Sequence, residues 1–285
     1  MIMKKKVLSL EEHQSILYEL LYVLDDFCKE NNIKYFLGYG TLLGAVRHQG
    51  IIPWDDDADV MMEREEYERF QKLIITKPPK GYEAYSIYNR PDYFYPFIKF
   101  GKKGTLLLER LDYAPTERIE LGINIDIFPI DGCPGETREQ ACFYGTSFFP
   151  RYLSIQQEWF KPVKWKDLIT WKEKIAYLLY FPTRLSFVRK MYFKKMFQNA
   201  TKYSCKETKY FSCIFWDYNG ARSVHECSAI KTLQRTPFGN RLLPIPSGYD
   251  QLLREEYGDY MVPPNEKDRV STHDMGDVYQ LERNL

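Results

Sequence analysis

Apolar residues recur at helical spacing near the start of the chain, at Leu17, Leu20, Leu21, Leu24 and Phe27. Ser9 and Glu12 precede them in the Ser-x-x-Glu pattern of a capping box. Together these features predict an amphipathic helix over about residues 9–31. A second helical period, through Tyr67, Phe70 and Ile74, predicts a helix over about residues 63–76.

Short apolar runs between glycines predict strands elsewhere. Residues 35–38 suggest one strand, followed by a tight turn over 38–41 and a helix over 42–48. Residues 82–131 form a strand-rich stretch, residues 135–210 are mostly helical in pattern, and a last helix is expected near 249–257. The predicted fold class is α+β, a mixed sheet flanked by helices. We expect a catalytic core over 1–134, a helical, basic and aromatic insertion over 135–230, and a C-terminal segment over 231–285 that completes the site.

The densest chemical cluster in the chain holds four carboxylates, at Asp55, Asp56, Asp57 and Asp59, next to Trp54. In a strand, Asp57 and Asp59 would point the same way and grip one hard cation. A Mg²⁺ ion needs only one or two protein carboxylates plus substrate phosphates, so the pair indicates phosphoryl-group chemistry. The alternative is a solvated acidic turn. The apolar residues that follow, Val60, Met61 and Met62, favour a buried strand end.

Gly40 and Thr41 stand upstream of these aspartates, between the predicted strand and helix. A helix that starts after a glycine turn offers backbone N–H groups and a positive dipole end to an anion. Strand, Gly-Thr turn, short helix and then Asp-x-Asp resembles the layout of the nucleotidyltransferase superfold. In that layout Gly40-Thr41 holds the phosphates and Asp57 and Asp59 form the metal pair.

Three blocks extend the resemblance to the LicD family, which is related to the fukutin-type ribitol-phosphate transferases. The blocks lie at 40–59, 122–132 and 246–264, while residues 150–230 carry no such pattern. The resemblance implies transfer of phosphocholine from CDP-choline to a sugar hydroxyl, or of the corresponding phosphoalcohol from another CDP-alcohol. The acceptor would be a cell-surface glycan precursor (teichoic acid, lipopolysaccharide or capsule), either free or lipid-linked. The reaction would release CMP and depend on Mg²⁺ or Mn²⁺.

Further site residues follow from the same logic. Asp126, in an alternating apolar stretch, would be the third carboxylate, completing the metal site or accepting a proton from the attacking hydroxyl. The alternative is a strand-end Asp that caps a neighbouring backbone. Asp55 shares the expected alternation with Asp57 and would bind a second metal. Asp131 precedes Gly132 and is expected in a turn.

Basic and aromatic side chains complete the candidate substrate site. Arg47 and His48 end the helix after the Gly-Thr turn, where Arg47 would form a fork onto phosphate oxygens or simply complement the helix C-terminus. Lys99, flanked by apolar neighbours, is either an inward phosphate clamp or an exposed edge-strand lysine. Trp54 offers a flat face for stacking on a base, a sugar or a quaternary ammonium.

Charge is uneven along the chain. Residues 151–210 hold 14 Lys and Arg against 4 Asp and Glu, whereas the rest holds 26 against 35. A basic amphipathic segment favours an anionic membrane surface, and the alternatives are a solvated basic face or, less favoured, nucleic acid, so we predict no nucleic-acid partner. The six cysteines show no zinc or disulfide-framework spacing, and the basic N-terminus is not followed by a signal-peptide core. We therefore expect a cytoplasmic protein, with peripheral contact at the inner membrane face.

Two other functions fit the same residues. One is a nucleotidyltransferase that moves a nucleoside monophosphate from a nucleoside triphosphate to a small molecule or protein, with pyrophosphate as product. The other is a non-catalytic module that binds glycan or membrane. The presence of Asp57, Asp59 and Asp126 argues against the second.

Overall fold

The computed structural model describes residues 4–90, 93, 95–111, 114–147, 165–167, 170–180, 187, 191, 194, 197–198, 200–214, 223–270 and 278–282. The chain divides into two compact units. The first comprises residues 1–90, 97–129 and 228–285, and the second comprises residues 91–96 and 130–227. The residues predicted above to bind metal or substrate all belong to the first unit, whereas Asp131 belongs to the second.

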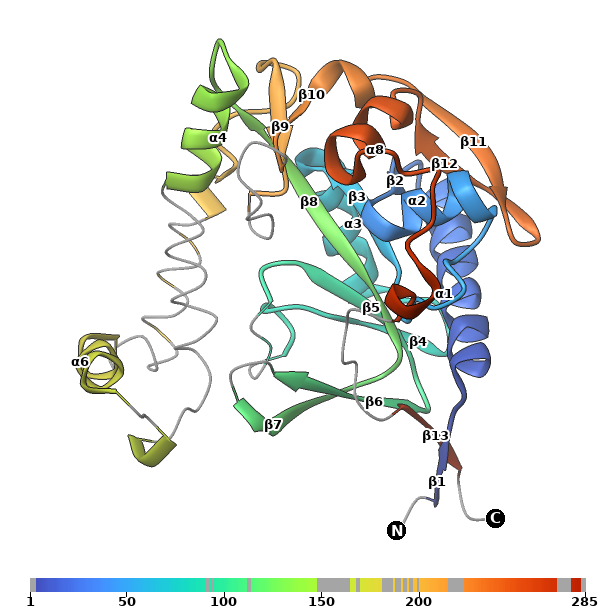
Figure 1. Ribbon diagram of the computed structural model, residues 1–285. Helices are drawn as coiled ribbons and strands as arrows, with labels where there is room; N and C mark the ends of the chain where they lie inside the picture. Colours follow the sequence, from blue (N-terminus) through green and yellow to red (C-terminus); the bar gives the residue numbers. More distant parts are fainter. Residues whose placement is uncertain are drawn as a thin grey trace. The chain divides into compact units, whose positions relative to one another are not determined.

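A sheet in the order β2-β3-β8-β5-β4 forms the centre of the first unit (Figure 1). Its strands are β2 (Phe36–Leu37), β3 (Asp59–Glu63), β4 (Tyr82–Tyr85), β5 (Ile98–Lys102) and β8 (Asn124–Cys133). Because β5 pairs with β4 on one side and β8 on the other, it is an interior strand. Its residues Ile98 to Gly101 are buried, as expected for a strand covered on both faces.

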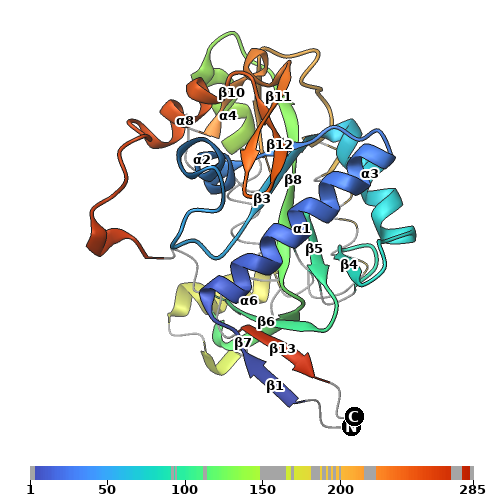
Figure 2. The same cartoon turned by 90° about the vertical axis from the view of Figure 1, so that its right-hand side faces the viewer.

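Four α-helices and two 3₁₀ turns accompany this sheet. They are α1 (Leu10–Glu30), α2 (Tyr39–His48), α3 (Arg64–Thr76), α8 (Tyr249–Tyr257), η4 (Cys227–Ile230) and η5 (Glu266–Asp268). The predicted capping box is present, because the Ser9 side chain accepts from Glu12 N and the Glu12 side chain accepts from Ser9 N. The apolar stripe of α1 is buried and the helix packs on β5 (Figure 2). The predicted helices at 9–31, 63–76 and 249–257 are thus confirmed.

A second sheet, in the order β1-β13-β6-β7, joins the two ends of the chain. Its strands are β1 (Lys4–Val7), β6 (Thr105–Leu111), β7 (Ala114–Leu121) and β13 (Val278–Glu282). A hairpin of β11 (Leu233–Phe238) and β12 (Arg241–Pro246) lies against α1. The Tyr22 hydroxyl of α1 donates to Phe238 O (3.0 Å) and accepts from Asn240 N (2.9 Å), which fixes the hairpin tip.

The second unit begins where β8 continues past Pro129. Its strands are β9 (Tyr210–Ser212), which pairs with the end of β8, and β10 (His225–Glu226), which pairs with β9. Its other elements are α4 (Arg138–Ser147), η1 (Trp165–Asp167) and α6 (Trp171–Tyr180). The fold class is α+β, a mixed sheet with flanking helices, as predicted. The three-part division at residues 134 and 230 stays a prediction.

Three local expectations are corrected by the structure. Helix α2 starts at Tyr39, so Gly40 and Thr41 lie in its first turn and not in a turn before it. Strand β3 starts at Asp59, so residues 55–58 form a loop and strand alternation does not relate Asp55 or Asp57 to Asp59. Asp131 lies inside β8 and is buried, because this strand runs on through Gly132 instead of turning.

Candidate active site

The loop before β3 is held in place by close backbone contacts with two helices. A Cβ on Gly44 of α2 would lie 2.4 Å from the Gly50 carbonyl oxygen, so this position admits only glycine. From α1, the Gln14 side-chain amide donates to Ile52 O (3.1 Å) and to Asp55 O (2.7 Å). These contacts fix the path of the loop that carries Trp54 and the aspartates.

The first turn of α2 lies directly beside this loop. Its N-cap is Gly38, which has no side chain with which to cap the helix. Tyr39 adopts a left-handed backbone conformation (φ 42°), which for a non-glycine residue is typical of strained functional sites. A Cβ on Gly40 would lie 3.2 Å from Asp55 Oδ2, so the Asp55 carboxylate reaches over this turn.

Thr41 connects the same turn to β3. Its hydroxyl accepts from Asp59 N at 2.7 Å, and Gly38 N donates to Asp59 O at 3.0 Å. From the other neighbour of β3, Asp126 N donates to Ala58 O at 2.9 Å. The start of β3 is therefore fixed from both sides, and the Gly-Thr and Asp-x-Asp positions predicted from the sequence are brought together.

Asp55, Asp57, Asp59 and Asp126 form what we call the carboxylate cluster. Burial, followed by the charges of Asp59 and Asp55, raises the pKa of Asp57 well above its usual value. Burial, followed by Asp126 and Asp55, raises the pKa of Asp59 in the same way. Such mutual repulsion in a buried place is typical of groups that bind a cation.

Lys99 brings a positive charge to this cluster. Its Nζ lies 2.7 and 3.0 Å from the two carboxylate oxygens of Asp126, in register across β5 and β8. Only 3% of Lys99 is exposed, so the edge-strand alternative is wrong. The Lys99 ammonium also opposes the rise in the pKa of Asp59. A buried pair of this kind fixes the Asp126 side chain in one orientation.

The cluster does not amount to a complete metal cage. Among the residues that the structure describes, no three His, Cys, Asp or Glu side chains are placed to hold an ion by themselves. A pair such as Asp57 and Asp59 is nevertheless the ligand set expected for Mg²⁺, which keeps several waters and takes the remaining oxygens from substrate phosphates. The oxygen-only donor set suits Mg²⁺ or Mn²⁺.

Arg47, His48 and Trp54 are also brought together. Arg47 Nε donates to His48 Nε2 (2.9 Å), and the His48 ring meets the Trp54 ring edge-on, with centroids 5.8 Å apart. Arg47 Nη1 donates to Tyr260 O (2.9 Å), in the segment after α8. Burial, then the charges of Arg47 and Arg269, lowers the pKa of His48.

Three residues at the site carried no sequence signal strong enough to single them out. They are Gln14, Tyr257 and Arg269. Burial of the Tyr257 hydroxyl, then Glu256 and three members of the carboxylate cluster, raises the pKa of this tyrosine far above its usual value. Arg269 lies over the Trp54 ring, with its guanidinium carbon 5.4 Å from the centroid. Tyr257 lies within the third sequence block, but its spacing did not predict a contact with the aspartates.

The sequence was compared with family models and with known proteins. A family model described as LicD/FKTN/FKRP, nucleotidyltransferase domain, matches residues 32–171. The chain is 28% identical over 279 residues to the lipopolysaccharide cholinephosphotransferase LicD of Haemophilus influenzae, covering 94% of this chain and 97% of that protein. These matches support the LicD family for this chain.

Two shorter matches each cover about a quarter of the chain. An uncharacterised protein of Rickettsia typhi is 44% identical over 81 residues, covering 28% of this chain and 24% of that protein. An uncharacterised protein of Rickettsia prowazekii is 46% identical over 66 residues, covering 23% of this chain and 25% of that protein. The family model and the Haemophilus influenzae relative support the family predicted from the three sequence blocks.

Proposed function

We propose that this LicD-family protein transfers phosphocholine from CDP-choline to a sugar hydroxyl of a cell-surface glycan precursor and releases CMP. The observation that carries the proposal is the match over 94% of the chain to a relative named as a lipopolysaccharide cholinephosphotransferase. The carboxylate cluster beside the first turn of α2 supplies suitable chemistry. Lipopolysaccharide, teichoic acid and capsule precursors are the acceptors to be compared.

Each site residue then has a role in the transfer. Asp57 and Asp59, with Asp55 beside them, would hold Mg²⁺ or Mn²⁺, which would supply positive charge to neutralise the CMP leaving group. Gly40 and Thr41 direct first-turn N–H groups at the donor phosphates. The acceptor oxygen forms a bond to the choline-bearing phosphorus as the bond from that phosphorus to the CMP oxygen breaks. The hydroxyl proton passes to Asp126, which Lys99 holds in place.

Calorimetric titration tests the donor. CDP-choline, CDP-ribitol, CDP-glycerol and CTP are titrated with Mg²⁺ into the unaltered protein, into Asp57→Asn and into Asp56→Asn. We expect CDP-choline to bind most tightly, and Asp57→Asn to weaken it by about 10-fold or more, since a charged ligand contact is lost. Asp56→Asn removes the same charge one residue away and should bind nearly as the unaltered protein does.

Product analysis separates the alternatives. CMP released from CDP-choline only when glycan acceptor is present supports phosphocholine transfer. Pyrophosphate released from CTP would instead make the protein a nucleotidyltransferase. No nucleotide binding, with an Asp57→Asn variant that still functions in cells, would make it a non-catalytic binding module.

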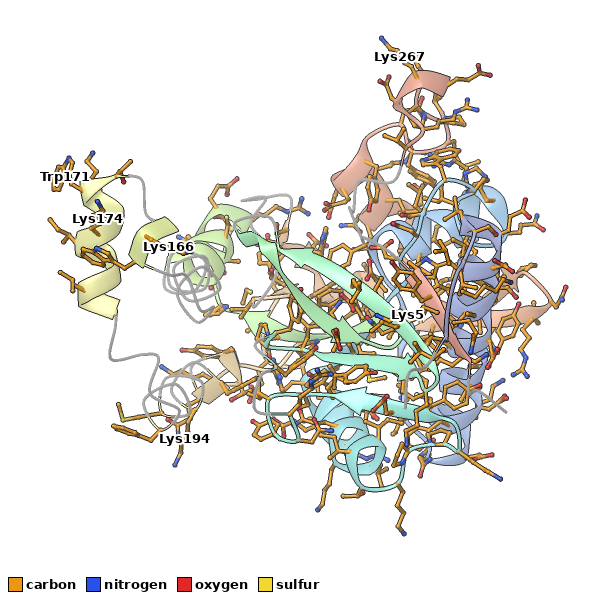
Figure 3. All side chains as sticks on the ribbon, turned by 90° about the horizontal axis from the view of Figure 1, so that it is seen from below. Lys5, Lys166, Trp171, Lys174, Lys194 and Lys267 are labelled. Carbon is orange, nitrogen blue, oxygen red and sulfur yellow. The ribbon has the colours of Figure 1, made fainter. Side chains whose placement is uncertain are left out.

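We also propose that the protein is cytoplasmic and that helix α6 brings the second unit into contact with the cytoplasmic face of the inner membrane. Trp171, Ile175 and Leu178 follow one another at helical spacing and are 67%, 48% and 61% exposed. Lys172 and Lys174 lie on the same helix, and Figure 3 shows Lys174 and Trp171 projecting outward. An apolar stripe flanked by lysines fits the boundary of an anionic bilayer.

No helix in the described part of the chain has the length and apolar character needed to cross a membrane. Surface contact is tested by sedimentation with vesicles of phosphatidylglycerol and phosphatidylcholine, compared with phosphatidylcholine alone. Binding should require the anionic lipid, weaken with salt, and be lost in Trp171→Ser/Leu178→Ser. The control Leu242→Ser changes an apolar side chain that is 53% exposed on β12 and should bind normally. If Trp171→Ser/Leu178→Ser binds anionic vesicles as well as Leu242→Ser does, the proposed membrane contact of α6 is wrong.

A further inference from the structure

Two arginines of the first unit, Arg47 and Arg269, stand near each other without a carboxylate partner in the described part of the chain. Four other arginines of this unit each pair with an acid, Arg69 with Glu66, Arg235 with Asp25, Arg241 with Asp26 and Arg254 with Asp250. The difference is therefore local. Two positive charges held together without a counter-charge are unfavourable unless an anion joins them.

Each of the two arginines is held by its own hydrogen bonds to other residues. Arg47 Nη1 donates to Tyr260 O at 2.9 Å and its Nε to His48 Nε2 at 2.9 Å. Arg269 Nε donates to Pro264 O at 3.0 Å, while its guanidinium lies over the Trp54 ring at 5.4 Å. A guanidinium has five N–H donors, and within the described part of the chain Arg269 uses one of them in a hydrogen bond.

His48 and Trp54 tie the two guanidiniums into one group. The His48 ring meets the Trp54 ring edge-on at 5.8 Å, so Trp54 contacts both His48 and Arg269. Each arginine acts electrostatically on His48, and Arg269 acts on Arg47. Trp54 is also joined directly to Asp55 along the chain. The basic group therefore borders the carboxylate cluster.

We propose that Arg47, His48, Trp54 and Arg269 form a diphosphate clamp, in which Arg269 is the residue that completes the grip. Planar guanidiniums bind phosphate oxygens through paired N–H donors, and two of them suit a group with two adjacent phosphates. Two sources fit, the diphosphate of a CDP-alcohol donor and the diphosphate of a lipid-linked acceptor. The choice of these two sources rests on the proposed function.

The experiment is a titration of CDP and of farnesyl diphosphate into the unaltered protein, Arg269→Gln, Arg269→Lys and Lys267→Gln. Lys267 lies two residues from Arg269 and extends outward in Figure 3, so Lys267→Gln removes the same charge without the same contact. We expect Arg269→Gln to lower the affinity for the diphosphate ligand by about 10- to 100-fold and Arg269→Lys to lower it by less. Lys267→Gln should change this affinity by less than about twofold. Arg269 is exposed, and an unchanged melting temperature verifies that each variant is folded.

The outcomes separate the clamp from the transfer reaction. A loss confined to CDP assigns the clamp to the donor, and a loss confined to farnesyl diphosphate assigns it to the acceptor. If Arg269→Gln binds both ligands as Lys267→Gln does, the clamp is wrong, even if CDP-choline still yields CMP. If CDP binding falls in Arg269→Gln while CDP-choline yields no CMP, the clamp stands and the proposed transfer is wrong.

Discussion

The Asp59 carboxylate occupies a place that disfavours its own charge. It is 9% exposed, and burial with Asp126 and Asp55 raises its pKa. Asn has nearly the same shape and carries no charge, so Asp59→Asn should be more stable than the unaltered protein by about 0.5–2 kcal/mol near neutral pH, the usual gain when an unfavourable functional residue is replaced. The same change should abolish turnover. Urea denaturation in metal-free buffer, beside a CMP-release assay, measures both effects.

An exposed aspartate provides the matched control for this prediction. Asp250 accepts from Arg254 Nε (2.9 Å) and from the Tyr260 hydroxyl (2.8 Å), and the hydrogen bonds lower its pKa. Asp250→Asn loses favourable contacts with a cation and should lower stability slightly, the opposite sign to Asp59→Asn. A decrease for both variants would contradict the claim that the carboxylate cluster is held together against repulsion.

At the scale of elements, the sequence predicted long periodic segments well and short ones less well. Helices α1 and α3 have several turns of apolar repeat, so their bounds follow to within a residue or two. The loop before β3 has no such repeat, and its aspartates looked like a strand. Its true path depends on Gly44 and on Gln14, whose partners lie far along the chain. Local pattern cannot reveal contacts of that kind.

The site shows the same division between local and distant information. Gly40, Thr41, Asp57 and Asp59 were predicted as one group, since their spacing along the chain already implies the layout. Tyr257 and Arg269 come from a distant segment near the end of the chain, which the Arg47 hydrogen bond to Tyr260 O brings to the site. Lys99 was left open between two orientations, and only the pairing of β5 with both β4 and β8 decides that it is interior.

At the scale of the whole molecule, two sets of buried groups oppose each other in their effect on stability. Asp57 and Asp59 have a raised pKa in the folded state, so the folded chain binds protons that the unfolded chain releases above pH 3.8, and their contribution falls as pH rises. His13 acts in the other direction. Burial lowers its pKa from 6.5 to about 4, so the unfolded chain binds the extra proton.

His13 is 3% exposed in α1, and its Nε2 has no hydrogen-bond partner in the described structure. The stability that neutral His13 retains above pH 6.5 is therefore lost as pH falls towards 4. Between about pH 7.5 and about pH 5, the unaltered protein should lose about 2 kcal/mol relative to His13→Leu. Urea denaturation of both proteins at both pH values measures this difference. The carboxylates titrate alike in the two proteins and cancel, and any packing change in the variant is the same at both pH values. Parallel pH profiles would therefore show that His13 takes up its proton equally well in the folded and unfolded chain.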